Sequence, residues 1–178
     1  MNFRSANVKI TRSRLPWKKQ CIQVDGVAAF DAKKSYRLIS SVTTVSELQT
    51  DKAVIRIEQP RYYKSIYHVY TQGHDYTISR LSHWQWECRS KQNVYMISRI
   101  GGIKCIISHE GRQMAIMSLN TNLPFTEDRN TYIRVNEQRH LNVSIAAALV
   151  VKPFGISLDT LTLNNNKLVT IPKLELAR

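Results

Sequence analysis

Short runs of β-branched and aromatic residues, separated by turn residues, make up most of the chain and predict many antiparallel strands. Cys21–Val24 and Val27–Phe30 flank Asp25-Gly26, a dipeptide that supplies the positive φ angles of a two-residue hairpin turn. Because turn signals recur about every 8–12 residues, the pattern is typical of a barrel or a sandwich. Further predicted strands are Ser35–Val45, Ala53–Glu58, Arg61–Thr71, Tyr76–Leu81, Trp84–Cys88, Val94–Ile100, Ile103–Ser108, Gln113–Leu119 and Tyr132–Val135.

Two of these segments show a clear alternation of side chains. In Ala53–Glu58, the alternation places Val54 on the face opposite Ile55 and Ile57. Trp84–Cys88 alternates large apolar residues with polar ones, as a half-buried strand does.

One late segment, Leu141–Val151, departs from the strand pattern because it is apolar without a continuous polar face. A helix of this kind has to be buried on every side. It would span roughly 16 Å, whereas crossing a bilayer takes about 20 apolar residues. A closed barrel surrounds such a helix with apolar side chains, because the inward-facing residues of every strand point toward the axis. We therefore predict a mainly β fold, a closed antiparallel β-barrel around a buried hydrophobic C-terminal helix at Leu141–Val151.

The length of 178 residues corresponds to about one domain. We predict a barrel domain over residues 1–153 and a C-terminal extension over residues 154–178, which forms a hairpin or a docked tail. Residues 1–19 contain six Lys and Arg residues and no acidic residue. They are expected to form a basic arm or an edge strand.

The charge of the chain is strongly positive, with 26 Lys and Arg residues against 13 Asp and Glu residues. Such an excess attracts nucleic acid, anionic lipid or acidic proteins, although a basic face can also serve solubility alone. Three cysteines are an odd number, which argues against a disulfide framework and for a reducing compartment. Because the first residues also lack a secretory signal, we expect a cytoplasmic protein.

The sequence contains no recognisable catalytic motif, and its acidic residues are scattered. We therefore predict no enzymatic activity and no cofactor. Cysteine and histidine side chains are the ligands that zinc prefers, but the close Cys-x-x-Cys pairs of structural zinc sites are absent. No metal site is predicted. The residues considered for one are His83, Cys88, Cys105 and His109.

Three segments in succession resemble the second half of the tubby C-terminal-like superfamily. They are Lys104–Met117, with a Gly-containing turn between two apolar strands, then Asn130–Val135, and then Leu141–Val151. The superfamily includes plant LURP-one-related proteins, bacterial relatives and phospholipid scramblases. The resemblance covers about Tyr62 to Lys152 and implies a barrel of about twelve strands wrapped around a hydrophobic helix. The chain departs from many relatives at residues 136–140 and in the 27 residues that follow Val151.

The resemblance also implies a ligand, because tubby proteins bind phosphoinositide headgroups through basic residues on the barrel exterior. We expect a non-enzymatic binding or adaptor protein that meets anionic membrane lipid and is cytoplasmic or peripheral at the membrane. Each Lys or Arg near an anionic leaflet contributes about 1 kcal/mol. The candidate residues are Arg12, Arg14, Lys18, Lys19, Arg80, Arg89, Lys91, Arg99 and Lys104.

Two alternative functions remain open at this point. Interleaved aromatic and basic residues are a possible stacking platform for single-stranded nucleic acid, although no recognised nucleic-acid motif accompanies them. The segment 155–178 is a candidate for docking a protein partner or completing a homodimer. The residues of the stacking platform are Tyr62, Tyr63, Lys64, Tyr67, Trp84, Trp86 and Arg89.

Overall fold

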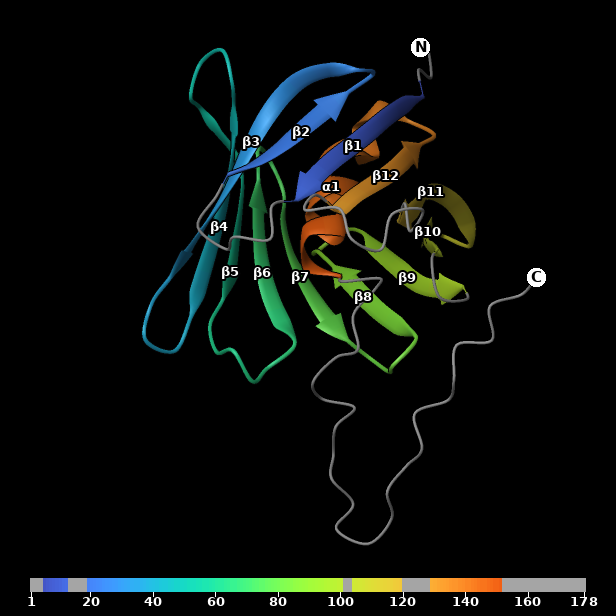
Figure 1. Cartoon of the computed structure of the whole chain (residues 1–178). Helices are drawn as coiled ribbons and strands as arrows, with labels where there is room; N and C mark the ends of the chain where they lie inside the picture. Colours follow the sequence, from blue (N-terminus) through green and yellow to red (C-terminus); the bar gives the residue numbers. More distant parts are fainter. Residues whose placement is uncertain (1–4, 13–18, 101–103, 120–128, 152–178) are drawn as a thin grey trace, which may run out of the picture.

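The structure is a computed structural model that describes residues 5–12, 19–100, 104–119 and 129–151. The described chain forms antiparallel strands followed by two short helical segments (Figure 1). The elements are β1 (Ala6–Arg12), β2 (Gln20–Val24), β3 (Val27–Tyr36), β4 (Ser41–Glu47), β5 (Ala53–Gln59), β6 (Ile66–Thr71), β7 (Asp75–Arg80), β8 (Gln85–Arg89), β9 (Val94–Ile100), β10 (Lys104–His109), β11 (Arg112–Leu119), β12 (Arg129–Val135), the 3-10 helix η1 (Gln138–His140) and the α-helix α1 (Leu141–Val150).

Every strand pairs with its two neighbours, and β1 closes the ring by pairing with both β2 and β12. This closed antiparallel barrel of twelve strands confirms the predicted fold class. Residues 6–12 of the predicted basic arm therefore form a strand that is paired on both sides, neither an arm nor an edge strand. The pairing is possible because Ala6, Val8 and Ile10 alternate with polar residues and point into the core.

Tight turns connect the hairpins as the sequence predicts. Asp25 and Gly26 have φ angles of 49° and 83°, and Glu110 and Gly111 have φ angles of 50° and 75°. Positive φ at both central residues is the geometry that matches the twist of paired strands. Gly73, in the turn predicted between the strands Arg61–Thr71 and Tyr76–Leu81, has a φ angle of 94°. The turn that Gly101-Gly102 predicts lies outside the described residues.

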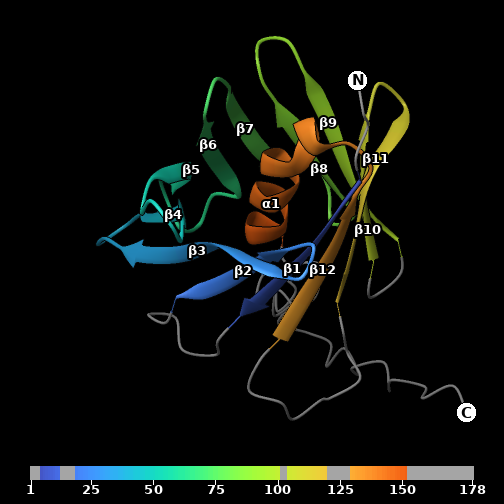
Figure 2. The ribbon, with the colours of Figure 1, turned by 90° about the horizontal axis from the view of Figure 1, so that it is seen from above.

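Helix α1 lies inside the ring of strands, as Figure 2 shows. Six consecutive residues, Val143 to Ala148, are all buried. Because 3.6 residues make one turn, six residues in a row face every direction around the helix axis. The helix ends at Val150, one residue before the predicted end, because Val151 has an extended backbone. The prediction of a hydrophobic helix surrounded by protein is confirmed.

Several details of the predicted strands were wrong. The run Ser35–Val45 is interrupted by a loop at Arg37–Ser40, and the strand predicted from Arg61 begins only at Ile66. Val54 was expected to face away from Ile55, yet both are buried in the core. The pairing of β4 with β5 shifts between Val45 and Ser46, opposite Val54, and this irregularity breaks the strict alternation of faces.

Candidate functional site

The basic residues predicted on the later strands do not form one surface. Arg80, Arg99 and Lys104 lie at one end of the barrel, where β7 and β9 end and β10 begins. Arg89 and Lys91 lie at the opposite end, where β8 ends. Arg89 is also neutralised locally, because its guanidinium donates two hydrogen bonds of 2.9 Å to the Glu87 carboxylate. This contact lowers the pKa of the Glu87 carboxyl.

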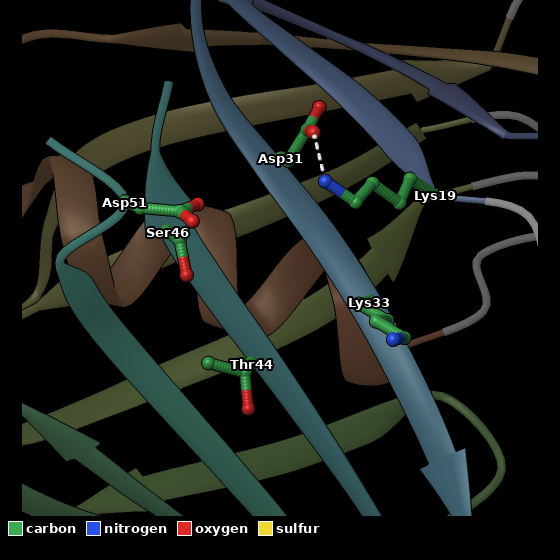
Figure 3. Close-up of a pocket in the computed structure, with 6 residues that line it drawn as sticks. All are labelled: Lys19, Asp31, Lys33, Thr44, Ser46 and Asp51. Carbon is green, nitrogen blue, oxygen red and sulfur yellow. Dashed lines mark hydrogen bonds and ion pairs between the residues drawn. The ribbon is translucent and has the colours of Figure 1, made fainter. Parts of the chain in front are cut away.

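Of the four candidate residues near the start of the chain, only Lys19 has a side-chain contact that the structure describes. Arg12 is the last residue of β1, and Arg14 and Lys18 lie outside the described residues. Lys19 is exposed, and its Nζ lies 3.1 Å from Oδ2 of Asp31. Figure 3 shows this ion pair at the wall of a pocket of about 260 Å³. Two amines and two carboxylates line the pocket, so it offers no net charge to select an anion. Its lining residues are Lys19, Asp31, Lys33, Thr44, Ser46 and Asp51.

Arg80 and Arg99 converge on one tryptophan at their end of the barrel. The guanidinium carbon of Arg99 lies 5.4 Å from the ring centroid of Trp86 and 5.8 Å from that of Trp84. The guanidinium carbon of Arg80 lies 6.0 Å from the Trp86 ring. Such cation–π contacts contribute about 0.5–1 kcal/mol each at exposed sites. They also fix the direction of two planar groups that match phosphate and carboxylate geometry.

The two tryptophans differ in accessibility. Trp86 is 7% exposed and belongs to the core, whereas Trp84 is 54% exposed and precedes β8. Trp84 was predicted to lie in the half-buried strand; it lies in the β7–β8 loop because the backbone N–H groups of Leu81 and Ser82 donate to the carbonyl of Gln85 and close a turn there. A side chain of Arg80 supports this turn, since its Nε donates to the carbonyl of Ser82 at 3.1 Å.

Three described loops connect strands at the same end as Arg80 and Arg99, and they carry basic and exposed apolar residues together. They are Arg37–Ser40, residues 60–65 and residues 81–84, at the lower edge of the barrel in Figure 1. None of the three contains an Asp or a Glu. We call this surface the basic end; its residues are Arg37, Leu38, Ile39, Arg61, Tyr62, Tyr63, Lys64, Arg80, Leu81, Trp84, Arg99 and Lys104.

The opposite end of the barrel has a different composition. Its loops combine acidic residues with basic ones, so that charges of both signs are close together. Arg139, for example, pairs with the Glu137 carboxylate at 2.7 Å. The two ends therefore differ in chemistry across the described loops: the three loops of the basic end combine Lys and Arg with exposed apolar residues and contain no carboxylate. The charged residues of the opposite loops are Asp25, Asp51, Lys52, Lys91, Glu110, Glu137 and Arg139.

The sequence prediction named the aromatic residues Tyr62, Tyr63 and Trp84 of the basic end as stacking candidates but missed its aliphatic members. Leu38 and Ile39 lie between two β-branched segments, so the local pattern is the same as that of a continuous strand. Pro60 marks the neighbouring β5–β6 loop, since proline is rare inside a paired strand, but it gives no signal for residues 37–40.

A separate cluster surrounds His140 where α1 begins. His140 is 3% exposed, and its Nδ1 lies 3.1 Å from the hydroxyl of Tyr95. Nε2 of His140 accepts a hydrogen bond of 3.1 Å from Nε of Arg139. A guanidinium can only donate, so the neutral ring carries its proton on Nδ1. Burial, with a smaller effect of Arg139, lowers the pKa of His140 below its ordinary value of 6.5.

We expect this cluster to make stability depend on pH. Because the pKa of His140 is lowered in the folded protein, the unfolded chain binds the proton more tightly, and stability falls as the pH drops below about 6.5. Protonation would also oppose the nearby Arg139 and the partial positive charge at the helix start. Thermal melts of the wild type and of His140→Gln between pH 8 and pH 5 measure this, with the variant showing the smaller dependence. Equal slopes would contradict the assignment.

The residues considered for zinc do not converge. No group of three or more His, Cys, Asp or Glu residues able to hold a metal ion occurs within the described ranges. Burial raises the pKa of the Cys88 thiol to about 12 and that of Cys105 to about 11. Since the thiolate is the form that binds metals and reacts, these two cysteines act as apolar core residues.

Comparisons with known proteins leave the family open. No protein-family model matches the chain, and neither the curated proteins nor the solved structures provide a match. The tubby-like resemblance therefore stays a hypothesis, although the twelve-stranded barrel is the fold that it implies. Within the described part of the chain, no helix is long and apolar enough to cross a bilayer.

Proposed function

We propose that the protein is a non-enzymatic binding protein that attaches to the surface of an anionic membrane through the basic end. One observation carries this proposal. The loops of this end present cationic and exposed aromatic or aliphatic side chains together, with no carboxylate in the same three loops. Aromatic rings are favoured at the headgroup level of a bilayer, and cations there gain from the negative surface potential. The predicted peripheral, cytoplasmic location agrees with this role.

The family resemblance supports the same ligand class. Tubby proteins bind phosphoinositide headgroups through basic residues of the barrel exterior. Arg80, Arg99 and Lys104 are the predicted residues that lie together at the basic end. Lys104 is exposed, and no carboxylate of the described chain lies within ion-pair distance of it. Of the nine basic residues predicted from the sequence, we therefore assign Arg80, Arg99 and Lys104 to the binding of anionic headgroups.

Single-stranded nucleic acid is the second candidate ligand. The half-exposed ring of Trp84 beside Arg99 would allow a base to stack on it. The predicted row of stacking residues is shorter than expected, however, because Trp86 is buried in the core. Retention on single-stranded DNA that falls steeply with salt would favour this candidate.

Vesicle flotation tests the proposal directly. Neutralising Lys64 and Lys104 together (Lys64→Gln, Lys104→Gln) should weaken binding to anionic vesicles by about 2 kcal/mol, or roughly 30-fold. The matched control is Lys52→Gln with Lys91→Gln, which removes the same charge from exposed positions at the opposite end. The control should bind as the wild type does. No flotation of the wild type at low salt, or equal losses in both double variants, would refute the proposal.

A further inference from the structure

The β3–β4 loop carries two aliphatic residues at its tip that the barrel does not cover. Leu38 is 96% exposed and Ile39 is 60% exposed. Tyr63, on the adjacent β5–β6 loop, is also largely exposed. Single exposed apolar residues are ordinary, but three that lie on adjoining loops form a patch of the kind that marks a binding surface.

Hydrogen bonds hold this loop in a defined shape. The Arg37 N–H donates to the carbonyl of Ser40 at 2.8 Å, which closes the turn. The Tyr62 N–H donates to the carbonyl of Ile39 at 3.1 Å, and the Tyr62 hydroxyl lies within hydrogen-bond distance of the carbonyls of Arg37 and Ser40. Leu38 is therefore exposed on an ordered loop that is hydrogen-bonded to the neighbouring β5–β6 loop.

A buried polar pair supports the two loops from below. Ser41 and Gln59 are 3% and 8% exposed, and the Ser41 hydroxyl donates to the Gln59 side-chain oxygen at 3.4 Å. The Gln59 side-chain nitrogen donates to the carbonyls of Tyr62 and Lys64, both at 3.3 Å. Buried side-chain amides are costly unless they are hydrogen-bonded. The two hydrogen bonds that Gln59 donates fix the position of the β5–β6 loop, and the β3–β4 loop is hydrogen-bonded to that loop.

Cationic side chains flank the apolar tip. Lys34 lies over the ring of Tyr36, 5.2 Å from its centroid, and Arg61 lies 5.8 Å from the centroid of the Tyr63 ring. Arg37 and Lys64 belong to the two loops themselves. In the part of the chain that the structure describes, no carboxylate forms an ion pair with Arg37, Arg61 or Lys64. Exposed apolar residues flanked by cationic side chains are complementary to an anionic bilayer, in which negatively charged headgroups cover the hydrocarbon.

We propose that Leu38 and Ile39 insert into the headgroup and upper acyl region of an anionic bilayer, so that burial of apolar surface adds to the attraction between charges. This inference rests on the proposed function and identifies the segment that penetrates the membrane. Charges alone hold a protein above the headgroups, where added salt releases it. Apolar burial is not screened in this way.

The first test removes the apolar side chains without changing charge. Leu38→Ser with Ile39→Ser should weaken binding to vesicles of phosphatidylserine and phosphatidylcholine by about 10- to 100-fold. This factor should stay constant between about 0.05 and 0.2 M NaCl, whereas the factor lost by the Lys64 and Lys104 variant should shrink as screening grows. The matched control is Val27→Ser with Leu48→Ser, which removes exposed aliphatic residues from the opposite end.

The second test measures depth. Leu38→Trp should lose fluorescence on bilayers with brominated acyl chains, beyond the change that the native tryptophans show in the wild type. Val27→Trp should add no such loss. Insertion is supported if the Leu38→Trp fluorescence is quenched and if the fold-loss of binding in the Leu38→Ser, Ile39→Ser variant does not change with salt.

The outcomes separate the two proposals. A wild type that does not bind anionic vesicles refutes the proposed function and the insertion together. If the wild type binds and both serine double variants bind equally well, insertion is refuted, but the proposed attachment by charge is not. Retention on single-stranded DNA that needs Leu38 and Ile39, without any vesicle binding, assigns the tip to nucleic acid and overturns the inference.

Discussion

Ala147→Glu is expected to abolish folding. Ala147 has no exposed surface and lies in α1, where the helix is covered by protein on all sides. A glutamate there adds volume to a packed core and brings a carboxylate among buried residues that, in the described part of the chain, include no Lys or Arg. An unpaired buried charge costs several kcal/mol, which is comparable with the total stability of about 5–15 kcal/mol of an ordinary domain.

Circular dichroism and thermal melting measure this effect. The variant should collect in inclusion bodies or lack a cooperative transition. Ala53→Glu is the control, because it makes the same substitution at an exposed position of β5 and should change the free energy of unfolding by less than about 0.5 kcal/mol. A cooperatively melting Ala147→Glu protein would mean that this side of α1 is open to water.

Ile145→Ala should destabilise the protein without unfolding it. Ile145 is fully buried and is one of the largest side chains of α1. Truncation leaves a cavity between the helix and the strands, which lowers the free energy of unfolding by about 2–5 kcal/mol. The corresponding drop in melting temperature is about 2–4 °C per kcal/mol for a chain of this length.

Chemical denaturation gives the free energy directly. Ile39→Ala provides the comparison, because it makes the same truncation at a side chain that is 60% exposed, where we expect a change below about 0.5 kcal/mol. Equal effects of the two substitutions would show that the helix contributes little to the barrel core.

The barrel and its helix were predictable because their signal repeats along the whole chain. Alternating residues and Gly-containing turns recur from β2 to β12, and an apolar run without a polar face leaves few places for a helix. The turns at Asp25-Gly26 and Glu110-Gly111 could be located for the same reason, since positive φ angles restrict the residue types.

The basic end was only partly predictable. Charge identified Arg80, Arg99 and Lys104 as candidates, but charge alone did not distinguish them from Arg89 and Lys91 at the other end. Which residues share an end depends on where each strand begins and stops, and strand limits are the least certain part of a sequence pattern. Because strand limits are uncertain, Leu38 and Ile39 were predicted to lie within a strand rather than in a loop.

The partnership of β1 with β12 has a consequence for biosynthesis. Ala6 pairs with Val135, 129 positions further along the chain. A nascent polypeptide therefore exposes one flank of its first strand until nearly all of the ring has left the ribosome. Contacts so distant in sequence slow the search for the native topology, and an open flank invites pairing with other chains in the meantime. We expect chaperone demand during synthesis to exceed that of a helical protein of equal length.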